Sequence, residues 1–200
     1  MNQADWAEDT ARTILQVPLP RRWGHTQGVA AQARTLGPIL GKHADLLVAA
    51  AWLHDIGYAP DLVDTGFHPL DGARYLSDLP QASDLLCRLV AHHSCAAIEA
   101  AVRSLDGPLC QQFEPVGGEL ADALIYCDMT TGPDGQRMSV EQRLAEIHSR
   151  YGSNDPVTCA LERSASQLID AVARVRGKLT NATTARRESA ARHWALATAT

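Results

Sequence analysis

The stretch AWLHDIG at residues 51–57 decides the fold of this chain. It follows an apolar segment in which His54 lies seven residues, or two helical turns, after Leu47, so both residues share one helix face. We therefore predict a helix over about residues 44–56, and the glycine that ends the stretch is a natural C-cap. His54 and Asp55 lie about 100° apart around such a helix, so both can reach one ligand near its C-terminal end.

Helical periodicity continues on both sides of this stretch, and no alternating run of β-branched residues predicts a strand. Further helices are predicted over about residues 6–15, 21–36, 69–79, 83–93, 119–130, 139–151 and 156–180. The chain is thus predicted to be all-α, a bundle of about seven or eight helices. We expect residues 1–180 to form one domain, residues 106–118 to form a loop, and the Ala/Thr/Arg-rich residues 181–200 to form a disordered tail.

Composition excludes several classes of protein. The net charge of −5 argues against a general binder of nucleic acids or of membrane surfaces, which would need a basic face. No uncharged apolar run approaches the roughly 20 residues of a membrane span, and residues 1–10 lack the apolar core of a signal peptide. We therefore expect a cytoplasmic protein. The 5 cysteines show no CxxC spacing, which favours reduced thiols.

Histidines and aspartates form the candidate site. The predicted metal ligands are His25, His54, Asp55, His68, His92, His93 and Asp128. A single histidine on an apolar helix face is usually a core residue, but Asp128 lies in an otherwise apolar stretch and needs a partner if it is buried. Imidazoles and carboxylates on separate helices favour a shared divalent metal.

A helix that ends in Leu-His-Asp-Ile-Gly resembles the signature of the HD-domain metal-dependent phosphohydrolases. The upstream Arg22-Trp-Gly-His25 and the downstream Asp128 complete the spaced pattern of that family over about residues 20–135. The resemblance implies a helical HD domain with a central five-helix core. It also implies that His25, His54, Asp55 and Asp128 bind one metal ion.

The additional histidines are similar to those of the HD proteins that hold two ions. In that subset Asp55 would bridge the ions, and His68, His92 and His93 would hold the second one. The cyclic-dinucleotide phosphodiesterase branch shares this enlarged pattern, but its Gly-Tyr-Pro signature is absent here. This absence argues against cyclic dinucleotides as substrates.

The resemblance predicts a phosphohydrolase or phosphodiesterase that acts on a small phosphorylated metabolite, with a nucleotide as the favoured substrate. Asp55 is the predicted catalytic residue, and Fe, Mn, Zn, Co or Ni ions would activate water for attack on phosphorus. Arg22, Arg137 and Arg143 are candidate phosphate contacts, with solvated surface charges as the alternative. Two other functions stay open: a di-iron oxygenase, and a non-catalytic module that senses nucleotides or metals. The sequence also leaves a homo-oligomer open.

Overall fold

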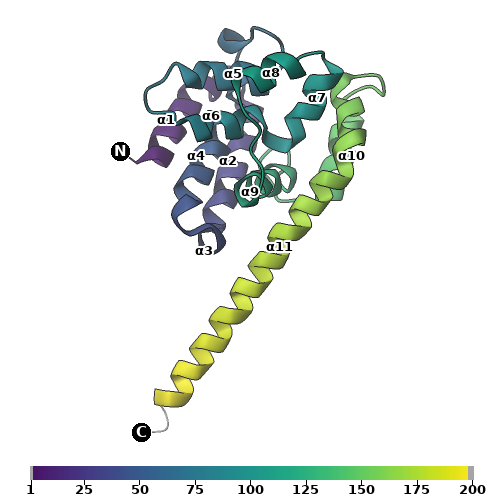
Figure 1. Ribbon diagram of the computed structural model, residues 1–200. Helices are drawn as coiled ribbons and strands as arrows, with labels where there is room; N and C mark the ends of the chain where they lie inside the picture. The colour runs from purple at the N-terminus through teal and green to yellow at the C-terminus, as the bar shows by residue number, and fades with distance from the viewer. Residues whose placement is uncertain (1, 198–200) are drawn as a thin grey trace.

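The computed structural model describes the backbone of residues 2–197 and the side chains of residues 2–189, and within this part of the chain no strand is formed (Figure 1). The helices are α1 (Gln3–Leu15), α2 (Pro20–Thr35), α3 (Gly37–Leu40), α4 (Ala44–Leu53), α5 (His68–Ser77), α6 (Asp84–Ala91), α7 (Ala96–Val102), α8 (Asp106–Gln112), α9 (Glu119–Met129), α10 (Val140–Arg150) and α11 (Pro156–Ala197). Short 3₁₀ turns are η1 (Gly41–His43), η2 (Ile56–Tyr58), η3 (Pro60–Leu62) and η4 (His93–Cys95). The predicted all-α class is confirmed.

Helix α4 lies at the centre of the main core. Every residue from Leu47 to Leu53 is buried, as expected for a helix that is apolar all round. It contacts α1, α2, α6 and α9, so elements from both ends of the domain surround it. Because α4 ends at Leu53, the next residues, His54 and Asp55, emerge among these helices and are buried as well.

Two glycines allow close backbone approaches beside the site. A Cβ on Gly57 would lie 2.1 Å from the His68 carbonyl oxygen, so only glycine lets η2 pack against the start of α5. A Cβ on Gly28 would lie 2.4 Å from the carbonyl oxygen of Gly135, which keeps α2 against the turn after α9. The predicted C-cap role of Gly57 is therefore wrong, since α4 ends earlier and this glycine serves interhelical contact.

A second, smaller apolar cluster lies between α9, α10 and α11. Its buried members are Met129, Val140, Ile147, Leu168 and Val172. Ser139 starts α10 with a capping box: its side chain accepts from Gln142 N, and the Gln142 side chain accepts from Ser139 N. Helix α10 thus starts where the sequence indicated and packs on α9 and α11.

Two segments differ from the sequence-based expectation. Helix α8 occupies residues 106–112 of the expected loop. Helix α11 continues without a break through the expected tail to Ala197. Its C-terminal part projects away from the other helices (Figure 1). The alanines and arginines of this segment have high helix propensity. The prediction missed the helix because it relied on apolar periodicity, which is weak in this segment. Residues 198–200 of the expected tail lie outside the described residues.

Residues 84–102 have a mean hydropathy of 1.3, and by length and composition alone they would suit a membrane span. The structure divides this segment into α6, η4 and α7, because Ser94 and Cys95 adopt positive φ angles of 47° and 62°. The apolar side of α6, which includes Leu86, Leu89 and Val90, is buried in the main core. Core packing therefore accounts for the hydropathy of this segment.

Candidate metal centre

Six of the seven predicted ligands come together in two adjoining groups of three. In each group the potential ligand atoms lie within 4.8 Å of one another. The first group contains His25 of α2, His54 after α4, and Asp128 of α9; the second contains Asp55 after α4, His68 of α5, and His93 of η4. Segments far apart in the sequence thus deliver imidazole and carboxylate groups to one buried place.

Asp55 directs one carboxylate oxygen toward the histidines of the first group and the other oxygen toward the histidines of its own group. Its Oδ2 lies 3.3 Å from His54 Nε2 and 3.7 Å from His25 Nε2. Its Oδ1 lies 3.3 Å from His68 Nε2 and 3.9 Å from His93 Nε2. This division is the arrangement expected of a carboxylate that bridges two cations.

Backbone carbonyls orient three of the imidazole rings. The Nδ1 atoms of His25, His54 and His93 lie 2.9, 2.8 and 2.7 Å from the carbonyl oxygens of Gly132, Ala51 and Val90, respectively. A carbonyl oxygen only accepts, so each Nδ1 carries the hydrogen, and in the neutral ring Nε2 presents its lone pair. This is how protein backbones commonly fix the tautomer of metal-binding histidines.

The potential metal-ligand atoms are arranged as expected around a cation, and poorly as hydrogen-bond partners of one another. His54 Nε2 is fully buried and has no hydrogen-bond partner among the residues whose side chains the structure describes. His68 Nε2 and His93 Nε2 face each other at 3.2 Å, and His25 Nε2 lies 3.1 Å from Asp128 Oδ1. Opposed lone pairs in a buried place are costly unless a cation or a proton lies between them. Nitrogen and oxygen donors of this kind suit divalent first-row metals.

The electrostatics keep the two aspartates ionised. Burial would raise the pKa of Asp55, but the nearby Arg22 guanidinium and His54 hold it well below its ordinary value. Burial would likewise raise the pKa of Asp128, yet the neighbouring imidazole groups of His25 and His54 lower it overall. Both carboxylates are therefore available as anionic ligands.

The histidines of the second group are kept neutral. Burial lowers the pKa of His68 well below its ordinary value, against the opposing charge of Asp55. Burial also lowers the pKa of His93, with His54 adding to the effect. Neutral imidazole is the form that binds a metal.

Ser94 supports Asp128 from the far side. Its hydroxyl donates a short hydrogen bond to Asp128 Oδ2, the oxygen that His25 does not contact. The left-handed backbone of Ser94 and Cys95 is uncommon for residues other than glycine and costs about 1–3 kcal/mol for each residue. Sequence reasoning missed Ser94, because no sequence signal indicates this backbone conformation.

The predicted arginines lie in different places. Arg22 Nη1 donates to Asp55 Oδ2 at 2.7 Å, and its guanidinium lies 3.9 Å from the centre of the Tyr58 ring. Arg143 is 4% exposed, and its Nη2 lies 3.8 Å from Asp128 Oδ1. Arg137 is exposed and does not line the cavity at the site, because the turn after α9 directs residues 134–137 to the surface.

His92 is the predicted ligand that does not join the cluster. Helix α6 ends at Ala91, and His92 directs its Nε2 to the carbonyl oxygen of Phe113 at 2.7 Å. Its ring is half-buried beside Val116 and Leu124, and it belongs to neither group of potential ligands. His92 therefore has a structural partner, and the neighbouring His93 alone faces Asp55.

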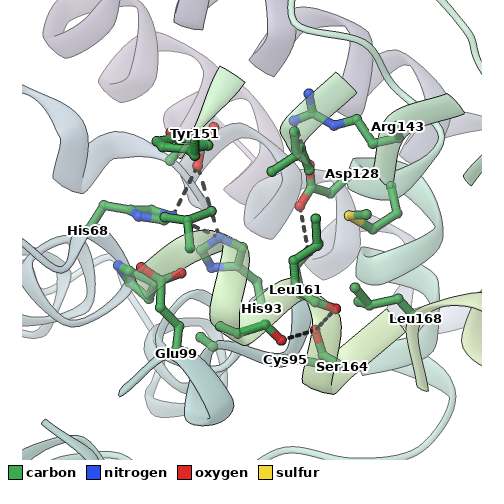
Figure 2. Close-up of a pocket in the computed structure, with 18 of the residues that line it drawn as sticks. His68, His93, Cys95, Glu99, Asp128, Arg143, Tyr151, Leu161, Ser164 and Leu168 are labelled. Carbon is green, nitrogen blue, oxygen red and sulfur yellow. Dashed lines mark hydrogen bonds and ion pairs between the residues drawn. The ribbon is translucent and has the colours of Figure 1, made fainter. Parts of the chain in front are cut away.

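A cavity of about 100 Å³ opens on the donor groups (Figure 2). Its lining includes Asp55, His68, His93 and Asp128. Sequence reasoning also missed the four largest of the other polar lining residues, which are Tyr58, Glu99, Arg150 and Tyr151. No motif marks them, because they reach the cavity only through the packing of η2, α7 and the end of α10.

These features define an all-helical protein with a buried histidine–aspartate cluster suited to divalent cations. The family model of the HD domain matches residues 22–152, well over half of the chain, and the chain belongs to this family. The predicted family is thereby confirmed, whereas the two-ion form of the site stays a prediction. No curated protein and no solved structure matches the chain significantly.

Proposed function

We propose that this protein is a metal-dependent phosphohydrolase that hydrolyses a phosphoester of a small metabolite. Membership of the HD family supports a metal-dependent hydrolase, and the clustered imidazoles and carboxylates support metal binding. The observation that carries the proposal is the placement of Asp55, whose two oxygens face separate groups of donors beside an open cavity.

The two donor groups support a proposal for the ligands of each ion. His25, His54 and Asp128 would hold one ion, His68 and His93 would hold the other, and Asp55 would bridge them. Bound ions would supply an activated water at neutral pH and would offset the negative charge of the phosphoester. Asp55 would thus act in catalysis by fixing the position at which water and phosphorus meet.

Two arginines supply positive charge from the protein itself. Arg22 and Arg143 line the cavity beside Asp55 and Asp128, respectively. A guanidinium can donate two parallel hydrogen bonds to phosphoryl oxygens, and it stays charged at every physiological pH. The ring of Tyr58 and the Asp55 carboxylate orient Arg22 before substrate arrives, which reduces the entropic cost of binding.

The test combines metal analysis with turnover. Purified protein loaded with Mn²⁺ is assayed on bis-p-nitrophenyl phosphate and on a panel of phosphomonoesters. We expect hydrolysis that a chelator abolishes, that Mn²⁺ restores, and that Asp55→Asn removes. Asp134→Asn is the matched control, because this exposed aspartate forms its ion pair, among the described residues, with the exposed Arg21 alone.

The same samples separate the two alternatives. Stoichiometric metal without hydrolysis of any phosphoester would contradict the proposal and favour a sensing module. Bound iron with consumption of dioxygen, again without hydrolysis, would favour a di-iron oxygenase.

A further inference from the structure

The cavity at the metal centre has a second end with a different chemistry. Its lining runs from the donor residues to side chains of α9, α10 and α11 (Figure 2). Six of these lining residues, which we call the apolar lobe, are Met129, Ile147, Val157, Ala160, Leu161 and Leu168. Figure 2 shows Leu161 and Leu168 on the side of Asp128, opposite His68.

We propose that the apolar lobe binds a compact apolar substituent of the substrate, so that the protein acts on small alkyl phosphoesters rather than on nucleotides. This inference rests on the proposed phosphohydrolase function and names the substrate class of that site. The phosphoryl group would lie at the donor residues, with Arg22 and Arg143 beside it, and the alkyl group would extend into the lobe.

The lobe belongs to an apolar cluster of its own rather than to the main core. Met129, Ile147 and Leu168 are buried members of the small cluster between α9, α10 and α11, and Val157 and Leu161 pack against it. Side chains of a closed core normally contact one another on all sides, whereas these also face the cavity of the metal centre. A groove with this lining favours an apolar ligand group.

Few polar groups at this end could recognise a nucleobase. Among the described lining residues, Ser164 places a hydroxyl one helical turn after Leu161 of the lobe. The Ser164 hydroxyl already donates to the Ala160 carbonyl oxygen at 2.9 Å. A base edge presents several donors and acceptors, and leaving them unpaired in a buried place is costly. The lobe offers neither an amide nor a charged side chain for them.

A second basic cavity does not change this assignment. It is lined by Arg21, Arg22, Arg143 and Arg150 together with prolines at residues 18, 20 and 133. Three of these arginines, Arg22, Arg143 and Arg150, also line the metal-centre cavity. Arg143 and Arg150 lie four residues before and three residues after Ile147 on α10, so positive charge borders the lobe, whereas its own six side chains carry none.

The experiment compares substrates with the same skeleton. Phosphate release by the Mn²⁺-loaded protein is measured with methyl, propyl and butyl phosphate, with glycerol 1-phosphate and with thymidine monophosphate. Burial of one methylene group raises affinity about fourfold, so kcat/KM should rise by that factor for each carbon that enters the lobe. Propyl phosphate should exceed glycerol 1-phosphate, its dihydroxylated analogue, by at least about tenfold. Equal or better use of the nucleotide or of glycerol 1-phosphate would overturn the inference.

Two variants test the lobe directly. Leu161→Asn places an amide in the lobe and should lower kcat/KM for butyl phosphate about tenfold while changing that for methyl phosphate little. Ile169→Asn is the control, because Ile169 lies on the same helix, is 37% exposed and does not line the cavity. Val157→Thr, which keeps the side-chain shape, should show a smaller loss in the same direction and remains interpretable if Leu161→Asn does not fold.

Binding without turnover separates this inference from the proposed function. Calorimetry with the Mn²⁺-loaded protein should show propylphosphonate binding about tenfold more tightly than methylphosphonate. This preference without any phosphoester hydrolysis would overturn the hydrolase proposal and support the lobe assignment. Hydrolysis that is indifferent to chain length would support the hydrolase proposal and overturn the lobe assignment.

Discussion

The two halves of the donor cluster are built differently. His25 and His54, which are 2% and 0% exposed, belong to the half formed by α2, the end of α4, and α9. Backbone carbonyls fix both rings, and Ser94 and His25 hold the Asp128 carboxylate from two sides. We call this the inner half.

The outer half depends on helix ends and turns. His68 is the first residue of α5, its side chain is 13% exposed, and its ring stacks on Tyr58 with 3.9 Å between ring centres. His93 begins the turn η4, which contains the strained Ser94 and Cys95. Ligands held by rigid elements bind metals more tightly than ligands held by turns. We therefore predict that the ion proposed for the inner half binds more tightly than the ion proposed for the outer half.

The largest expected effect comes from the residue shared by both halves. Asp55→Ala removes the oxygens that face His54 and His68 and leaves Arg22 without its carboxylate partner. We expect loss of both ions and a fall in kcat of at least about 10³-fold, because the groups act as a unit. Metal content by mass spectrometry and steady-state kinetics provide the measurement. A variant that keeps two ions per chain would remove the bridging role of Asp55.

A smaller effect should distinguish the halves from each other. His68→Ala should abolish the outer ion while the inner one stays bound, and kcat should fall about 100-fold. His54→Ala should weaken the inner ion, since it removes a buried donor with no other partner. Titration of each variant with Mn²⁺ gives the stoichiometry. Equal metal loss in both variants would show that the halves are not independent.

Local sequence patterns were sufficient to predict the site residues that lie at the end of a single helix. His54 and Asp55 are adjacent, so any helix that ends there brings both to the same place. The choice between His92 and His93 could not be made in this way, because it depends on where α6 ends and how η4 turns. That turn is fixed by packing against α9 and α11, which are distant in sequence.

The arginines illustrate the same limit. Arg22 was predicted from its position three residues before His25 on α2, and the helix places both beside Asp55. Arg137 and Arg143 looked equivalent in the sequence, since both follow the turn after α9. Only the docking of α10 separates them, because it buries Arg143 and leaves Arg137 at the surface.

Ser94 should matter less than the ligands, but in a specific way. Ser94→Ala removes the hydroxyl that positions Asp128 Oδ2, and loss of such a supporting hydrogen bond typically lowers metal affinity about 10- to 100-fold. Ser94→Gly also removes the hydroxyl but relieves the positive φ, so it should gain up to about 1 kcal/mol in the free energy of unfolding. Both variants should bind the inner ion more weakly than Ser77→Ala, a control at the exposed end of α5. Unchanged affinity in Ser94→Gly would assign the residue to the turn rather than to the metal centre.

The smallest effect is expected at His92, which tests the boundary of the outer half. His92→Ala removes the hydrogen bond to the Phe113 carbonyl oxygen and should lower the free energy of unfolding by about 1 kcal/mol. Metal stoichiometry and kcat should stay as in the unmodified protein, since His92 belongs to neither group of potential ligands and its Nε2 already donates to Phe113. His92→Gln can still donate to that carbonyl and should recover part of the stability, as measured by chemical denaturation. A loss of the outer ion in His92→Ala would place His92 among its ligands and would require η4 to turn differently when metal is bound.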